Sequence, residues 1–218
     1  MCEECAMTYR LRKVRECPVC LNLMEECECT NRYLKRQSVH IMGKVFKYEP
    51  GNPDMPENRL IFRLKQANSR AVINFAADEL VPVVKRLVGD HPEKYVLVGV
   101  PRSHSAIRKY GYDHVRELCR ALTKRTGIPY MPAVVRKGAK GQQKEKNRQE
   151  RIEAAETSYG PAKRFRLKGK RVILVDDIIT TGASVGACAH AVRKCGARTV
   201  LCVCLGAHHK FQEIFDQH

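Results

Sequence analysis

The apolar residues from Tyr95 onward alternate between short continuous runs and helical spacing. Tyr95–Val100 is a continuous run, which is typical of a strand buried on both faces of a parallel sheet. Later segments predict three more strands and two helices, each helix followed by a glycine where it is expected to end. The strands are Met131–Val135, Arg171–Asp176 and Thr199–Leu205, and the helices are Tyr112–Arg125, before Gly127, and Ala183–Lys194, before Gly196. This alternation predicts an α/β fold, with a parallel sheet flanked by helices.

The first half of the chain is less regular. Val39–Tyr48 comes close to the alternation of a half-buried strand. Residues 57–87 have helical periodicity, and Pro82 within them is expected to kink or divide the helix. Residues 136–151 hold seven basic and two acidic residues, and they predict a loop that runs into a helix near Asn147–Glu156.

Six of the eleven cysteines lie before Thr30. Each Cys-x-x-Cys pair can supply two thiolates to a tetrahedral Zn²⁺, and a unit this short has too little core to fold without metal. The spacing therefore predicts a structural zinc ribbon, with Cys2, Cys5, Cys17 and Cys20 as ligands. Cys27 and Cys29 leave alternatives open, because either could replace a ligand or the two could bind a second ion. The predicted domains are a zinc ribbon at 1–30, a strand and linker at 31–56, and a larger domain at 57–218.

The segment Val172–Ser184 (VILVDDIITTGAS) carries the clearest chemistry. A buried strand ends in Asp176 and Asp177, and a turn rich in Thr and Gly then leads into a helix. Backbone N–H groups at a helix start bind phosphate, and Gly182 lets the backbone approach it closely. The two carboxylates would repel that phosphate, so they are better suited to sugar hydroxyls or to a hydrated cation.

Charge and hydropathy narrow the range of partners. The chain has 40 Lys and Arg residues against 23 Asp and Glu, a formal charge of +17, which favours nucleic acid or phosphate-rich ligands over neutral ones. The alternative is a solvated basic surface. Pro161–Arg171 alone holds six basic residues and no acid. No apolar run approaches the roughly 18 residues of a membrane helix, and no secretory signal opens the chain, so we expect a cytoplasmic protein with reduced cysteines.

The string VILVDDIITTGAS resembles the phosphoribosyl pyrophosphate signature of type I phosphoribosyltransferases. The resemblance implies the fold of that family and displacement of pyrophosphate from the anomeric carbon with the help of Mg²⁺. It implies that the two acids hold the ribose hydroxyls and contribute to catalysis, while the loop cradles the 5′-phosphate. Arg102, which follows the strand at 95–100, is expected to bind pyrophosphate, or else to be a surface arginine. The expected contacts are Asp176, Asp177, Ile178, Ile179, Thr180, Thr181, Gly182, Ala183, Ser184 and Arg102.

Together with the N-terminal cysteines, further segments resemble the ComF family of competence proteins. These segments are Leu60–Arg70, Val98–Ser103, Arg108–Leu122 and Gln143–Gly160. The resemblance implies a role in natural transformation and DNA uptake, with single-stranded DNA and a DNA-translocating ATPase as partners. Dimers are common in this fold, so a homodimer is an expectation. The chain departs from the family at Tyr112-Asp113-His114, where Phe-Asn-Gln is frequent, and Asp113 and His114 are expected at a packed helix start.

Two other functions fit the same residues. The protein could be a metabolic phosphoribosyltransferase that acts on a nucleobase or amine, or a non-enzymatic scaffold that binds phosphoribosyl pyrophosphate. Release of pyrophosphate separates the first from the second.

Overall fold

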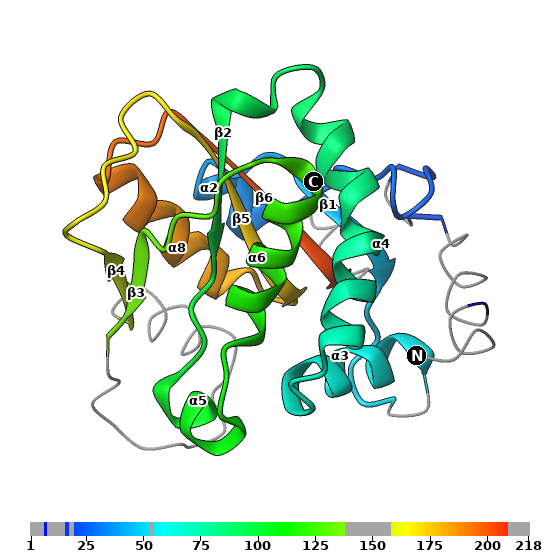
Figure 1. Cartoon of the computed structure of the whole chain (residues 1–218). Coiled ribbons are helices and arrows are strands. Elements are labelled where there is room, and N and C mark those ends of the chain that lie inside the picture. Colours follow the sequence, from blue (N-terminus) through cyan, green and yellow to red (C-terminus); the bar gives the residue numbers. More distant parts are fainter. Residues whose placement is uncertain (1–6, 8–15, 18–19, 53–54, 138–157, 209–218) are drawn as a thin grey trace.

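The centre of the molecule is a four-stranded parallel sheet with the strand order β1-β6-β5-β2 (Figure 1). The computed structural model describes residues 7, 16–17, 20–52, 55–137 and 158–208. The strands are β1 (Met42–Lys47), β2 (Tyr95–Gly99), β5 (Arg171–Ile179) and β6 (Thr199–Ala207). Because helices cover both faces, these strands are almost continuously buried and apolar. The predicted α/β architecture is confirmed.

Helices form a layer on each side of the sheet. On one side α3 (Pro56–Gln66), α4 (Arg70–Val88) and α6 (His114–Thr126) pack against alternate strand residues such as Leu97 and Val175. On the other side, α2 (Arg32–Arg36) and α8 (Ala183–Lys194) pack against their neighbours, such as Val98 and Leu174. Successive strand residues point to opposite faces, so a single strand contributes to both cores.

The segment at 131–135 was expected to be a strand of the main sheet, and this expectation is wrong. It joins the sheet through a single bridge between Leu97 and Tyr130 and then forms β3 (Val134–Arg136), which pairs with β4 (Tyr159–Pro161) in an antiparallel ribbon. Pro132 has no N–H to donate to a ladder of hydrogen bonds, which explains why pairing to the sheet does not continue there.

The long helical segment divides at Asn68, not at Pro82. Asn68 has a left-handed backbone (φ 40°), and the Ser69 hydroxyl caps α4 by accepting a hydrogen bond from the Val72 N–H. Pro82 lies within α4, on its exposed side. Solvent there can bond the carbonyl that the proline ring leaves without a partner, so the helix continues.

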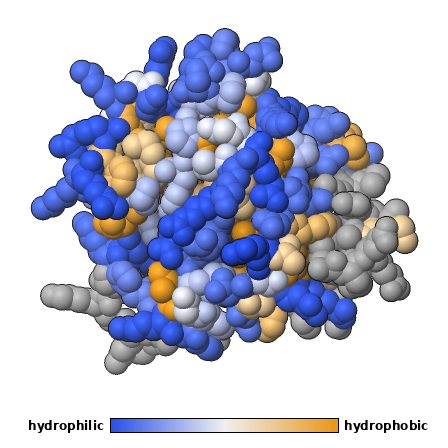
Figure 2. Space-filling view, viewed as in Figure 1, coloured by the Kyte–Doolittle hydropathy of each residue, from blue (hydrophilic) through white to orange (hydrophobic). Residues whose placement is uncertain are grey.

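Short elements complete the fold. These are the 3₁₀ turn η1 (Pro92–Lys94) and α5 (His104–Tyr110). The helix expected near 147–156 lies outside the described residues. Within the described ranges, no helix combines the length and the apolar character needed to cross a bilayer. The face seen in Figure 2 is largely hydrophilic, with small scattered apolar groups.

Candidate functional site

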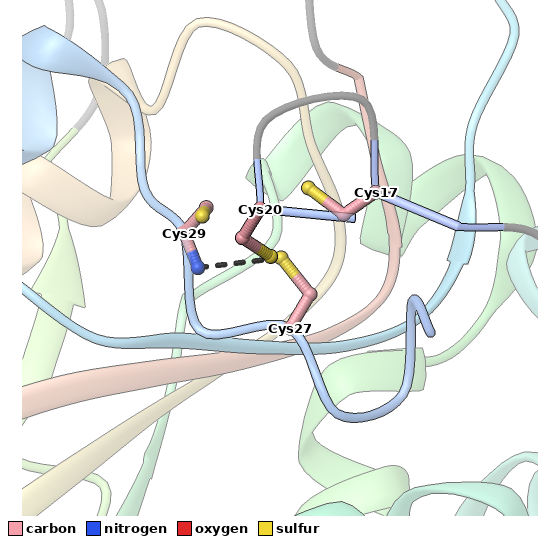
Figure 3. A group of neighbouring side chains, drawn as sticks. All are labelled: Cys17, Cys20, Cys27 and Cys29. Atoms are coloured by element: carbon pink, nitrogen blue, oxygen red, sulfur yellow. Dashed lines mark hydrogen bonds between the residues drawn. The ribbon is translucent and has the colours of Figure 1, made fainter. Parts of the chain in front are cut away.

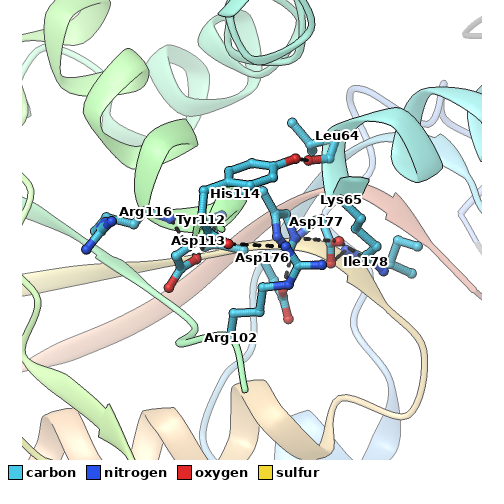
Figure 4. A network of polar contacts seen from close by, with 11 residues as sticks. Leu64, Lys65, Arg102, Tyr112, Asp113, His114, Arg116, Asp176, Asp177 and Ile178 are labelled. Atoms are coloured by element: carbon cyan, nitrogen blue, oxygen red, sulfur yellow. Dashed lines mark hydrogen bonds and ion pairs between the residues drawn. The ribbon is translucent and has the colours of Figure 1, made fainter. Parts of the chain in front are cut away.

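Asp177, at the carboxyl end of β5, is held by two basic side chains. Its Oδ2 lies 2.8 Å from Nε2 of His114 and 3.0 Å from Nζ of Lys65, and only 6% of the residue is exposed (Figure 4). Burial alone would raise the pKa of Asp177, but the hydrogen bond from His114 and the charge of Lys65 outweigh it and lower that pKa below the ordinary carboxyl range. Asp177 is therefore a firmly ionised anchor.

Its neighbour Asp176 has a different environment. Successive residues of a strand point to opposite faces, so Asp176 points away from the Lys65 and His114 pair. Burial, together with the negative charge of Asp177, raises the pKa of Asp176 well above its ordinary value. A group that neutralises or hydrogen-bonds this carboxylate would be bound favourably, as sugar hydroxyls or a hydrated cation would be.

The turn after β5 has the form of an anion cradle. Gly182 adopts a left-handed backbone (φ 80°) immediately before α8, and it has no side chain to cap the helix. The N–H groups of the first turn therefore face a small pocket of about 50 Å³, lined by Asp176 and residues 178–185. The dimensions and donors of this pocket suit a phosphate group.

A second pocket, of about 310 Å³, lies beside this cradle and also contains the acids. Arg102 lines it, and its guanidinium donates to the Tyr112 carbonyl at 3.3 Å and lies 4.7 Å from the centre of the Tyr110 ring. The arginine is thus held in place by aromatic neighbours and does not extend freely into solvent. The polar and charged lining residues are Lys65, Arg102, Ser103, His114, Arg136, Tyr159, Asp176, Asp177 and Ser184.

The structure brings Arg102, the two acids and the 180–184 loop together as the sequence predicted, and it adds residues that the sequence analysis missed. Asp113 caps α6 by accepting hydrogen bonds from the N–H groups of Val115 and Arg116, which directs His114 toward β5. The expectation of a packed helix start here is correct, but His114 also belongs to the site. A capping Asp followed by His was the available signal.

Lys65 reaches the site because α3 is tied to the start of α6. The Tyr112 hydroxyl donates to the Leu64 carbonyl, which positions the end of α3 over the acids. Asp177 raises the pKa of Lys65, although burial opposes this shift. The contact spans 48 residues of sequence, so periodicity could not reveal it.

Four cysteines form a separate cluster near the N-terminal end. The Sγ atoms of Cys17, Cys20, Cys27 and Cys29 all lie within 4.8 Å of one another (Figure 3). Cys17 and Cys20 were expected as ligands, whereas their expected partners Cys2 and Cys5 lie outside the described residues. Four thiol groups at this separation could hold a metal ion such as zinc.

The surroundings of the cluster fit a tetrathiolate metal site. The Lys44 ammonium group is fully buried and donates to the carbonyls of Cys27 (3.2 Å), Cys29 (2.9 Å) and Met42 (3.2 Å). A Zn²⁺ ion with four thiolates carries a net negative charge, and a buried ammonium group partly offsets that charge.

Comparison with known proteins adds one family assignment. Residues 106–213 match the model of the phosphoribosyl transferase domain. None of the curated proteins is similar enough to match.

Several solved structures share parts of the fold at low identity. The allosteric regulatory enzyme of purine biosynthesis is 18% identical over 66% of this chain and 30% of its own, with a TM-score of 0.43. A purine phosphoribosyltransferase from Pyrococcus horikoshii Ot3 is 24% identical over 69% of this chain and 73% of its own, with a TM-score of 0.35. A hypoxanthine phosphoribosyltransferase from Staphylococcus aureus is 16% identical over 67% and 68%, with a TM-score of 0.38. This chain thus spans under a third of the first of these proteins.

The family match covers α6, β5, α8 and β6, and with them the acids, the anion cradle and His114. The chain therefore carries a domain of the phosphoribosyl transferase type.

Proposed function

We propose that the protein binds phosphoribosyl pyrophosphate with Mg²⁺ at the carboxyl end of β5. The observation that carries this proposal is the junction of two pockets at Asp176: the small anion cradle, and the larger pocket that contains Arg102. A ligand with a phosphate at one end, a sugar in the middle and a second anionic group matches that arrangement.

Each part of the ligand has a partner of suitable chemistry. The N–H groups and hydroxyls of residues 180–184 receive the 5′-phosphate, and Asp176 accepts hydrogen bonds from the ribose hydroxyls. Arg102 lies where the pyrophosphate would extend and offers several N–H donors. Asp177 holds Lys65 and His114 at the edge of the pocket. When bound, Mg²⁺ supplies positive charge to the pyrophosphate oxygens.

Calorimetric titration with phosphoribosyl pyrophosphate and Mg²⁺ tests this proposal. We expect micromolar binding by the wild type and at least a tenfold loss in Asp176→Asn, because each lost hydrogen bond to a charged group is worth about 1.5–3 kcal/mol. Asp78→Asn is the matched control, since Asp78 pairs only with Arg125 at the surface among the described residues. Equal binding by both variants, or none by the folded wild type, would contradict the proposal.

We further propose that the protein binds single-stranded DNA through an exposed basic patch, defined as Lys163, Arg164, Arg166, Lys168, Lys170 and Arg198. All six residues are exposed. The Arg198 N–H donates to the Lys170 carbonyl at 2.8 Å, which joins the segment before β5 to the segment before β6. The patch therefore lies at the amino ends of the strands, opposite the phosphoribosyl site. Such a surface tracks phosphates with little dependence on sequence.

This patch, with the resemblance to ComF proteins, supports a cytoplasmic role in DNA uptake during natural transformation. A DNA-translocating ATPase and a second copy of the chain are the partners that the resemblance suggests. We assign the zinc to Cys17, Cys20, Cys27 and Cys29, and thus take Cys27 and Cys29 in place of Cys2 and Cys5.

Fluorescence anisotropy with a labelled single-stranded oligonucleotide tests the DNA-binding proposal. We expect Lys168→Ala/Lys170→Ala to weaken binding at low salt and to reduce the slope of log affinity against log salt by about one to two units. Lys85→Ala/Lys124→Ala removes the same charge from two exposed helix positions and should change the slope less. Identical slopes for the two double variants would rule out this patch.

A further inference from the structure

The helix α2 connects the cysteine cluster to the anion cradle. It begins two residues after Cys29, and Asn31 is its N-cap. The Asn31 Oδ1 accepts from the Leu34 N–H at 2.9 Å, while its Nδ2 donates to the Thr181 carbonyl at 3.1 Å. One side chain thus fixes both the start of the helix and the backbone of the cradle, 150 residues away in the sequence.

Leu34 makes a second contact with the cradle. This residue is fully buried, and a Cβ atom added to Gly182 would lie 2.7 Å from its Cγ atom. The left-handed glycine of the cradle therefore packs directly against α2, with no room between them. Tyr33 makes a similar contact one turn later, where a Cβ on Gly186 would lie 2.7 Å from the Tyr33 ring.

The cluster is itself fixed to the sheet. Lys44 on β1 donates to the carbonyls of both Cys27 and Cys29, and Arg86 on α4 forms an ion pair with Glu28 between them. At the other end of α2, Arg193 of α8 donates to the carbonyls of Gln37 and Ser38, both at 2.7 Å. The cluster, α2 and the cradle are therefore packed as one unit, so a change at one end alters the other.

We propose that Asn31 is a positioning residue for the anion cradle, and that it couples metal binding at the cysteine cluster to phosphate binding at residues 180–184. This inference rests on the proposed function, because it takes the cradle to bind the 5′-phosphate. Coupling between two binding sites is reciprocal, so a bound phosphate ligand strengthens metal retention by the same factor by which metal strengthens phosphate binding.

Asn31→Ser is the variant that isolates the bridge. Serine is as good an N-cap as asparagine, so α2 should remain capped, but it has no second polar atom to reach Thr181. Loss of one hydrogen bond to the cradle is expected to weaken binding of phosphoribosyl pyrophosphate with Mg²⁺ by about 3- to 10-fold. Arg36→Ala, at an exposed position of the same helix, is the matched control and should bind like the wild type.

A second readout measures zinc directly. The rate of zinc transfer to a chelating dye is recorded for each zinc-loaded protein with and without saturating ligand. We expect the ligand to slow zinc release several-fold in the wild type and in Arg36→Ala, and to have little effect in Asn31→Ser.

The outcomes separate the two proposals. A wild type that binds the ligand, with Asn31→Ser binding equally well and releasing zinc at the same ligand-dependent rate, overturns the coupling and leaves the proposed function intact. A zinc-loaded wild type that binds no ligand overturns both.

Discussion

At the scale of single residues, the two adjacent acids have opposite electrostatic environments. Asp177 is stabilised as a carboxylate by His114 and Lys65, whereas burial and the charge of Asp177 penalise ionisation of Asp176. One acid therefore anchors the surrounding helices, and the other retains unsatisfied affinity for a ligand. A pair of identical residues thus takes two roles because neighbouring strand positions face different surroundings.

Asp177→Asn should destabilise the protein in a manner that depends on pH. The pKa of Asp177 is lowered in the folded state, so its ionised form contributes stability above the unfolded value of about 4, and this contribution is lost as pH falls below that value. We expect a loss of about 1–3 kcal/mol at pH 7, which shrinks toward pH 3. Chemical denaturation across this pH range measures the difference.

The exposed Asp90 offers a control for that experiment. Asp90→Asn should leave the free energy of unfolding almost unchanged at every pH. A loss in Asp177→Asn that stayed constant from pH 7 to pH 3 would argue against an ionised anchor.

At the scale of secondary-structure elements, the cradle depends on how closely α2 and α8 approach each other. Gly182 supplies the left-handed turn that starts α8, and Leu34 of α2 fills the space that a side chain there would need. The geometry of the cradle is therefore set by a contact between two helices and not by the loop sequence alone.

Gly182→Ala should cost more than a left-handed alanine elsewhere. Alanine in this backbone region costs about 1–2 kcal/mol, and the contact with Leu34 adds strain. Gly169→Ala is a matched control, because Gly169 has a similar φ of 74° and nothing within 4 Å of an added Cβ. Thermal unfolding of the two variants should show the larger loss for Gly182→Ala, together with weaker binding of phosphoribosyl pyrophosphate. Equal losses in both would mean that the helix contact is unimportant.

At the scale of the whole molecule, the N-terminal segment is built into the domain instead of attached to it by a linker. β1 is a strand of the central sheet and α2 packs on α8, although both lie in the segment 31–56. Lys44 then joins β1 to the cysteine cluster. Metal at that cluster is expected to stabilise the fold as a whole.

Zinc content should identify the ligands. We expect Cys27→Ser/Cys29→Ser to lose most of the bound zinc and to lower the unfolding temperature, because two of four thiolates are removed. Cys2→Ser/Cys5→Ser should retain zinc at about one ion per chain. Elemental analysis of the purified proteins measures both, and the reverse result would restore the ligand set that the Cys-x-x-Cys spacing predicted.

The sequence by itself determined the parts of this protein that depend on neighbouring residues. Apolar runs identified β2, β5 and β6, glycines marked the ends of α6 and α8, and the string at 172–184 identified the acids and the cradle. These features follow from local periodicity and turn chemistry. Tertiary structure decided the rest: it brought Lys65 and His114 to Asp177, gathered Cys27 and Cys29 with Cys17 and Cys20, and fitted Asn31 to Thr181. Contacts between residues far apart in the chain arise only when packed layers bring elements together, and no local pattern records them.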